Sequence, residues 1–342
     1  MNYMWFILVA VGVSFLLTAA LRRYAISRSL IDVPNARSSH TVATPRGGGV
    51  AIVVAFVLSS VFLFVAGLMS TATFIANAGA GLAISLIGFM DDHGHIAARW
   101  RLLGHFAAAT WLLAWTGGLP PIELFGSTVD LGWAGQMMAI FYLVWLLNLY
   151  NFMDGIDGIA SVEAICACLG VCFLYYLSDL HNLVWGPLLL AASVAGFLYW
   201  NFPPARIFMG DAGSGFLGIT LGGLSLQAAW VSEPMLWAWL ILLGVFIVDA
   251  TFTLFRRLLR GDKVYEAHRS HAYQFASRRF GRHLPVTLAV GVINLFWLLP
   301  IAVGVTRFGL DGALGVIVAY VPLIALAIKF RAGDLEGPTI KN

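Results

Sequence analysis

The sequence predicts an all-α integral membrane protein, a polytopic bundle of about 11 transmembrane helices. Three observations predict this class. The 342 residues are 60% hydrophobic and only 11% charged, with a mean hydropathy of +0.86, so too little polar surface exists to cover a soluble core. The apolar segments are uniform rather than alternating, which favours helices over a barrel. The loops are short, so we expect residues 1–342 to form a single membrane-embedded domain.

Each expected helix corresponds to one apolar stretch, because a bilayer-spanning helix needs about 20 mostly apolar residues. The first stretch lacks a basic start and is too long for a signal peptide, and Arg22 and Arg23 follow it. We therefore expect an uncleaved anchor with its N-terminus outside. The fourth stretch is short. The expected segments are residues 3–21, 48–68, 73–90, 105–118, 133–150, 159–178, 183–200, 214–231, 235–255, 286–305 and 312–329.

The positive charges support this arrangement. When the loops are numbered outward from the first segment, nineteen of the twenty Lys and Arg residues fall on one side of the membrane, and only Arg307 falls on the other. The positive-inside rule makes the nineteen-charge side cytoplasmic. The C-terminus is then expected in the cytoplasm, with the N-terminus on the opposite side.

Two features of the composition exclude other classes. The net charge of +3 follows from this topology, and no basic-aromatic pattern indicates a nucleic-acid partner. The three cysteines lie within one apolar segment without His or carboxylate neighbours, so we interpret them as small apolar residues that form neither a metal site nor a disulfide framework. They are Cys166, Cys168 and Cys172.

Polar residues gather in the cytoplasmic loops, although a carboxylate at a helix centre costs roughly 2.5–3.5 kcal/mol on insertion scales. The first loop, DVPNARSSHTVATPRGGGV, contains Arg37 and Arg46, followed by glycines at 47–49. Arginine clamps phosphate, and glycines let the backbone approach an anion. The alternative is an ordinary loop of topology-setting arginines.

The second and third loops carry paired carboxylates. Asp91 and Asp92 are adjacent at the end of an apolar segment, where like charges usually have a cation or proton nearby. In NFMDGIDGIA, Asp154 and Asp157 are three residues apart and share a face if the turn is helical. Asn148 and Asn151 precede them on a related face, and such oxygens suit Mg²⁺ or Mn²⁺. Solvated loops are the alternative in each case.

The fourth and fifth loops add further candidates. Asp211 in RIFMGDAGS precedes a helix start and is poised to bind a metal. The fifth loop contains HRSH at 268–271, whose imidazoles suit a phosphate or, with less support, a soft metal. Its arginines suit an anion, with attraction to acidic lipid headgroups as the alternative. Asp249 lies inside the ninth segment and is expected to face the bundle.

All five loops lie on the same predicted side of the membrane. Hard-metal ligands combined with phosphate-binding residues at this surface indicate phosphoryl transfer between a cytosolic nucleotide compound and a lipid. An ion-coupled transporter is an alternative, but its charges should lie near the midplane. A CDP-alcohol phosphotransferase is another, but DGIDGIAS lacks the arginine of the usual DGxxAR start.

Four motifs resemble those of the polyprenyl-phosphate N-acetylhexosamine-1-phosphate transferases, glycosyltransferase family 4. They are DD at 91–92, NxxNFMDGIDG at 148–158, NxxPARIFMGDAGS at 201–214 and the histidine-containing last loop. The resemblance implies a single transferase domain in the bacterial inner membrane, with a periplasmic N-terminus and a cytoplasmic active site. It also implies that undecaprenyl phosphate attacks a UDP-sugar, that UMP leaves and that Mg²⁺ neutralises the diphosphate.

The resemblance also implies residue roles. Asp211 would bind the metal, and Asp91 and Asp92 would serve the metal and the lipid phosphate, one of them as a proposed base. Asn151, Asp154 and Asp157 would bind the nucleotide, and His268 with Arg269 would hold the diphosphate. Together with the loop analysis, the expected site comprises catalytic Asp91, Asp92, Asp154 and Asp157, substrate-binding Arg37, Arg46, Asn148, Asn151, His268, Arg269 and His271, and metal-binding Asp211 and Asp92.

The last loop distinguishes branches of the family. The phospho-N-acetylmuramoyl-pentapeptide transferases typically have adjacent histidines there, whereas this chain has HRSHAYQ. The chain therefore resembles more closely the enzymes that initiate O-antigen or related surface polysaccharides. Within these, the loop resembles those of members that handle 6-deoxy sugars such as N-acetylfucosamine or N-acetylquinovosamine, with UDP-N-acetylglucosamine close behind. The peptidoglycan branch stays an alternative, and a homodimer stays open.

Overall fold

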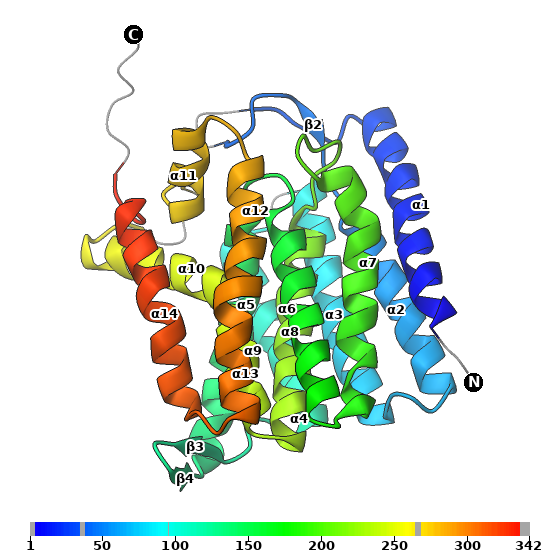
Figure 1. Cartoon of the computed structure of the whole chain (residues 1–342). Helices are drawn as coiled ribbons and strands as arrows, with labels where there is room; N and C mark the ends of the chain where they lie inside the picture. The colour runs from blue at the N-terminus through cyan, green and yellow to red at the C-terminus, as the bar shows by residue number, and fades with distance from the viewer. Residues whose placement is uncertain (1–3, 35–37, 95, 264–267, 336–342) are drawn as a thin grey trace.

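A computed structural model describes residues 4–34, 38–94, 96–263 and 268–335. In this part of the chain, long helices run roughly parallel in one bundle (Figure 1). Two short antiparallel hairpins lie at opposite ends of it: β1 (Ile31–Asp32) pairs with β2 (Thr44–Pro45), and β3 (Ile122–Leu124) pairs with β4 (Ser127–Val129). The fold is therefore the expected all-α membrane class.

The helices follow the apolar stretches of the sequence. In chain order they are α1 (Trp5–Ser27), α2 (Val50–Val65), α3 (Thr71–His93), α4 (Ala98–Thr116), α5 (Gly132–Met153), α6 (Ile159–Leu177), the 3₁₀ turn η1 (His181–Leu183), α7 (Trp185–Asn201), α8 (Asp211–Val231), α9 (Pro234–Leu242), α10 (Gly244–Leu259), α11 (Ala272–Phe280), α12 (Leu284–Ile293), the π-helical turn η2 (Asn294–Leu298), α13 (Leu299–Arg307) and α14 (Gly312–Lys329).

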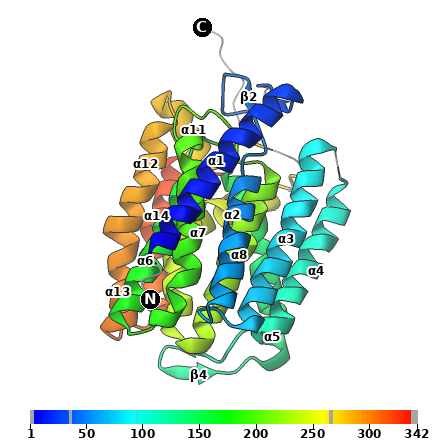
Figure 2. The same ribbon diagram turned by 90° about the vertical axis from the view of Figure 1, so that its right-hand side faces the viewer.

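Eight described segments are long and apolar enough to cross a membrane, and nine if one bent pair counts as a span. The other two expected segments are also helical. The second, 48–68, corresponds to α2, which has only 16 residues. The fourth, 105–118, lies within α4, whose first turns contain Arg99 and Arg101 and lower its hydropathy. In Figure 2 both helices run alongside their neighbours in the bundle.

The ninth expected segment, 235–255, is not one straight helix. It divides into α9 and α10, which are bent by 69° at Leu243. The sequence explains the bend, because α9 is apolar throughout whereas α10 is amphipathic and carries Asp249, Arg256 and Arg257. A helix with such a polar face avoids the lipid core, so α10 turns across the bundle (Figure 1).

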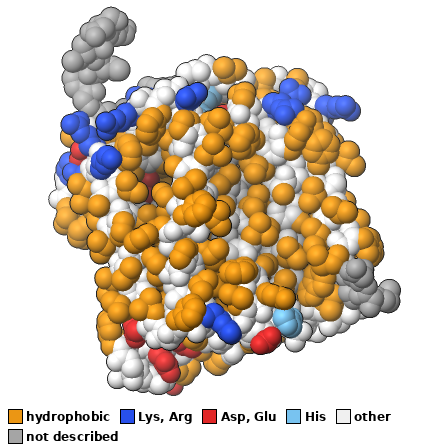
Figure 3. Space-filling model, in the orientation of Figure 1, with side chains coloured by type: hydrophobic (Ala, Val, Ile, Leu, Met, Phe, Trp, Pro, Cys, Tyr) orange, Lys and Arg blue, Asp and Glu red, His pale blue; other side chains and the backbone are white. Residues whose placement is uncertain are grey.

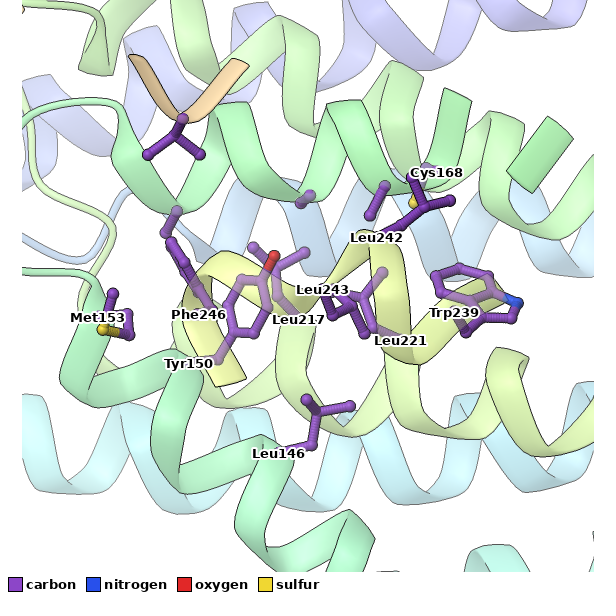
Figure 4. Close-up of a cluster of buried hydrophobic side chains, with 14 of the residues drawn as sticks. Leu146, Tyr150, Met153, Cys168, Leu217, Leu221, Trp239, Leu242, Leu243 and Phe246 are labelled. Carbon is purple, nitrogen blue, oxygen red and sulfur yellow. The ribbon is translucent and has the colours of Figure 1, made fainter. Parts of the chain in front are cut away.

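α8 is the most buried helix of the bundle and packs against α3 and α5. Large side chains fill the space beside it, with Leu217 and Leu221 of α8 lying near Tyr150 of α5 and Phe246 of α10 (Figure 4). α3 approaches α8 so closely that a Cβ on Gly88 would lie 2.5 Å from the backbone nitrogen of Ala212. This contact fixes the end of α3 against the start of α8.

We expect Gly88→Ala to destabilise the protein by about 1–3 kcal/mol, because the added methyl meets backbone that cannot move aside. Gly12→Ala in α1 is the matched control, since its new Cβ meets nothing within 4 Å and the change should stay within about 1 kcal/mol. Thermal unfolding in detergent measures both. Equal melting temperatures for the two variants would contradict the close-packing argument.

Candidate active site

A cavity of about 410 Å³ opens at the end of the bundle where α3 and α5 end and α8 begins. Four of the five expected aspartates line it: Asp92, Asp154, Asp157 and Asp211. We call it the acidic cavity. Arg46, Asn151, Phe208 and Gln274 also line it, so residues from five separate loops or helix ends meet there.

Asp91 faces a different side of α3 from Asp92. Its carboxylate forms an ion pair with Arg101 and accepts a hydrogen bond from the backbone N–H of Ile96 at 2.8 Å. The same Arg101 nitrogen lies 3.3 Å from Asp211 Oδ2. Arg101 thus bridges two of the expected site carboxylates, a role that the sequence analysis missed because no local pattern links residues 101 and 211.

Asp92 and Asp211 meet because backbone segments pack tightly around them. Asp92 is buried, and its Oδ2 lies 3.5 Å from the backbone nitrogen of Ala212. Gly210 has φ +78°, and a Cβ there would lie 2.7 Å from that same oxygen, so only glycine fits beside the carboxylate. Asn151 donates to Asp211 Oδ1 at 2.9 Å and to Ser214 Oγ at 3.1 Å.

The glycines of the first loop pair with the loop that leads into α8. Gly48 N–H donates to the Phe208 carbonyl at 2.9 Å, and Gly49 N–H donates to the Met209 carbonyl at 2.8 Å. A Cβ on Gly49 would lie 2.5 Å from Gly213 Cα, so these glycines serve close backbone packing. Arg46 donates to the Asp92 carbonyl at the cavity wall. Arg37 lies outside the described residues.

Asp157 is held by three other residues, Ala205, Thr287 and His283. Its Oδ2 accepts from the Ala205 N–H at 3.0 Å, its carbonyl accepts from Thr287 Oγ1 at 2.7 Å, and its Oδ1 lies 3.1 Å from His283 Nδ1. His283 Nε2 lies 3.0 Å from the Ser39 carbonyl. His283 therefore ties the first loop to the third, although no sequence motif contains it.

A second cavity of about 490 Å³ lies behind Asp157 and His283, and both residues line it as well as the acidic cavity. Arg278 and Arg282 also line it. A smaller cavity of about 160 Å³ lies on the other side of Asp211, lined by Asn148 with Arg101, Asn151 and other residues. Asn148 Nδ2 donates to the Val144 carbonyl at 2.7 Å, so one donor of its side-chain amide is used within α5.

None of the HRSH residues, 268–271, is among the described residues that line the acidic cavity. His271 is buried, with Nδ1 3.3 Å from Asp249 Oδ1, and the His268 ring stacks on it at 4.9 Å. Burial lowers the pKa of His268 to about 3, with help from His271 and Arg257, so His268 is neutral at pH 7. Because Ser270 N–H donates to His268 Nδ1, its remaining N–H is on Nε2.

The arginines of the fifth loop bind other parts of the protein. Arg256 forms an ion pair with Asp334 and donates to the Ala332 carbonyl, and Arg260 donates to the Gly333 carbonyl. Gly333 N–H in turn donates to the Ser270 carbonyl at 2.7 Å. The turn at 332–334 thus clamps the HRSH segment, and these arginines do not form the open anion-binding surface that the sequence suggested.

The electrostatics of the acidic cavity suit a divalent cation. Burial, followed by the negative charges of Asp211, Asp92 and Asp157, raises the pKa of Asp154 well above its usual value. Among the described residues, no group of three or more His, Cys, Asp or Glu side chains is placed to hold a metal ion by itself. Mg²⁺ commonly binds through one or two carboxylates plus waters and substrate phosphates, so this donor set fits it.

Comparison with known proteins identifies related sequences. A family model described as "Glycosyl transferase family 4" matches residues 74–229. The chain is 30% identical to a probable undecaprenyl-phosphate N-acetylglucosaminyl 1-phosphate transferase of Bacillus subtilis, over 78% of this chain and 76% of that protein. It is 30% identical to a decaprenyl-phosphate N-acetylglucosaminephosphotransferase of Mycolicibacterium smegmatis, with 84% and 79% covered. It is 29% identical to a phospho-N-acetylmuramoyl-pentapeptide-transferase of Pelotomaculum thermopropionicum, with 69% and 76% covered.

We expect His283 to stabilise the protein in a pH-dependent way. Burial alone would lower its pKa, but the hydrogen bond to Asp157, the Asp157 charge and the Ser39 carbonyl together raise it. The stabilisation is therefore complete below the unfolded-state pKa of about 6.5 and is lost as pH rises through the folded-state value.

Thermal unfolding measured across pH tests this. His283→Gln should lower the free energy of unfolding by about 1–2 kcal/mol below about pH 6.5 and by less at alkaline pH. His181→Gln is the control, because His181 faces the largely exposed Asp179 at 3.7 Å. A pH-independent loss in His283→Gln would contradict the assignment.

Proposed function

The chain belongs to glycosyl transferase family 4 and is a phosphotransferase, and we propose that it transfers an N-acetylhexosamine 1-phosphate from a UDP-sugar to undecaprenyl phosphate. UMP would leave, and undecaprenyl-diphosphate-sugar would form. The observation that carries this proposal is the meeting of Asp92, Asp154, Asp157 and Asp211 in one cavity at one end of an apolar bundle.

The main chemical problem is that both reactants are anions. The acceptor phosphate monoester has a second pKa near ~6, so at neutral pH it is mostly dianionic and needs little help from a base. Bringing it to a diphosphate requires neutralisation and alignment. Arg46 and Arg101 are arranged to supply positive charge beside the carboxylates. We therefore rank positioning above general-base catalysis by any aspartate.

Mg²⁺ held by Asp211 and Asp92 would neutralise the diphosphate charge, and Mn²⁺ has the same ligand preference. Asn151 would then orient Asp211 through its 2.9 Å hydrogen bond. Asp154 and Asp157 would bind the nucleotide from the turn opposite α8. Asp91 acts on this site through Arg101 rather than from the cavity wall.

The same geometry disfavours a transporter. The described carboxylates that line the cavity lie at helix ends rather than in the middle of the bundle. Figure 3 shows Lys and Arg side chains gathered mainly along the end of the molecule that carries α11 and β2. By the positive-inside rule we assign that end to the cytoplasm, which would place the acidic cavity in the cytoplasm and the N-terminus in the periplasm of a bacterial inner membrane.

The transferred sugar and the pathway belong to the finer part of the proposal. The names of several relatives favour N-acetylglucosamine, whereas HRSHAYQ resembles loops of enzymes for 6-deoxy sugars. A role in O-antigen or related surface polysaccharide synthesis accords with either sugar. Transfer of phospho-N-acetylmuramoyl-pentapeptide is the second candidate, because a relative of that name matches at 29% identity.

We expect Asp211→Asn to lower UMP release by about 10³-fold, because it removes a charge from the metal-binding carboxylates. Asp179→Asn is the matched control, since Asp179 is exposed at the opposite end and asparagine tolerates its positive φ. UMP release from UDP-sugar is measured in membranes with and without Mg²⁺ and undecaprenyl phosphate. Near-normal activity of Asp211→Asn at ordinary Mg²⁺ concentration would overturn the metal assignment.

A panel of sugar donors tests the substrate. UDP-N-acetylglucosamine, UDP-N-acetylquinovosamine, UDP-N-acetylfucosamine and UDP-N-acetylmuramoyl-pentapeptide are each supplied with undecaprenyl phosphate, and the lipid product is identified by mass. We expect an N-acetylhexosamine donor to be preferred over the pentapeptide donor by at least about tenfold. Preference for the pentapeptide donor would establish the second candidate. Solute movement without UMP release would instead indicate transport.

A further inference from the structure

Asp249 lies outside the acidic cavity, yet it is one of the most highly bonded carboxylates in the described chain. It belongs to α10 and is 7% exposed. Its Oδ1 accepts from the Ala272 N–H at 2.9 Å, and its Oδ2 accepts from the Tyr273 N–H at 3.0 Å. These are the first two N–H groups of α11, so Asp249 caps that helix from another helix.

The same carboxylate orients His271. Asp249 Oδ1 is 3.3 Å from His271 Nδ1, so this nitrogen carries the proton that points at the carboxylate. His271 Nε2 is buried without a hydrogen-bond partner among the described residues. The His271 backbone is fixed as well, because its N–H donates to Gln274 Oε1 at 3.2 Å.

α11 in turn contacts the turn that carries Asp154. Tyr273 Oη donates to the Phe152 carbonyl at 2.9 Å, two residues before Asp154. A Cβ on Gly155 would lie 2.2 Å from this Oη and 3.2 Å from Gln274 Nε2, so the turn is packed directly on α11. Gln274 itself lines the acidic cavity. A continuous set of contacts therefore joins Asp249 to Asp154.

We propose that Asp249 is a positioning residue. It fixes the start of α11 and the orientation of the His271 ring, and through Tyr273 it holds the turn that carries Asp154 against the acidic cavity. This inference rests on the proposed function for its catalytic readout, but the contacts themselves are independent of the substrate. Asp249 lines none of the three cavities described above, so it acts only through its neighbours.

Asp249→Asn is the direct test, because asparagine keeps the volume but removes the charge and one acceptor. We expect kcat to fall by about 10²-fold through misplacement of the turn. KM for the UDP-sugar should change by less than about threefold. Asp311→Asn is the matched control, since Asp311 caps α14 by accepting from the Leu314 N–H at 2.9 Å, far from the cavity. It should lower thermal stability without changing kcat.

Tyr273→Phe is a second variant that keeps the ring and removes only the contact with Phe152. We expect it to lower kcat by about tenfold, and it decides the matter if Asp249→Asn fails to fold. The positioning role is overturned if Asp249→Asn, or the tyrosine variant in its place, keeps the kcat of the Asp311→Asn control. It is equally overturned if only KM rises.

Hydrogen-exchange mass spectrometry supplies a readout that does not need turnover. Faster exchange of residues 152–158 is expected in Asp249→Asn and Tyr273→Phe but not in Asp311→Asn. If the wild-type protein releases no UMP from any UDP-sugar, the proposed function is refuted. The hydrogen-exchange result would still test the positioning role, because it does not depend on turnover. Unchanged hydrogen exchange across residues 152–158 in both variants would refute the positioning role of Asp249.

Discussion

At Gly88 the backbone of α3 touches the first residues of α8 with no room for a side chain, and this contact brings Asp92 beside Gly210 and Asp211. Burial raises the pKa of Asp154, and repulsion from the carboxylates of Asp211, Asp92 and Asp157 raises it further. Tight packing of an apolar bundle therefore holds together charges that would otherwise separate. Arg101 offsets part of the repulsion, and the remaining negative charge suits a divalent cation.

The sequence predicted the class of fold and the grouping of the polar loops, because long apolar stretches and local motifs carry that information in neighbouring residues. It also placed Asp92, Asp154, Asp157 and Asp211 on one side, where the structure brings them into one cavity. It did not predict the contact of Arg101 with Asp211 or that of His283 with Asp157, since each joins residues more than one hundred positions apart, and no local pattern encodes such a pair.

The two largest differences from expectation have a common origin in α10. Its polar face begins at Asp249, within a segment that is apolar on average, so average hydropathy did not predict the bend at Leu243. The histidines that follow were expected to face phosphate, but His271 turns toward Asp249, and Asp249 itself faces the bundle as expected. Ion pairs within the protein likewise occupy arginines that looked available for anions.

The clamp at residues 332–334 has a consequence for biogenesis. Ser270, Arg256 and Arg260 are synthesised well before the turn that holds them, and α12, α13 and α14 must be inserted in between. During synthesis, the contact between Gly333 and Ser270 thus cannot form until the turn at 332–334 has left the ribosome. A nascent chain released before Asp334 therefore lacks part of the framework around its histidines.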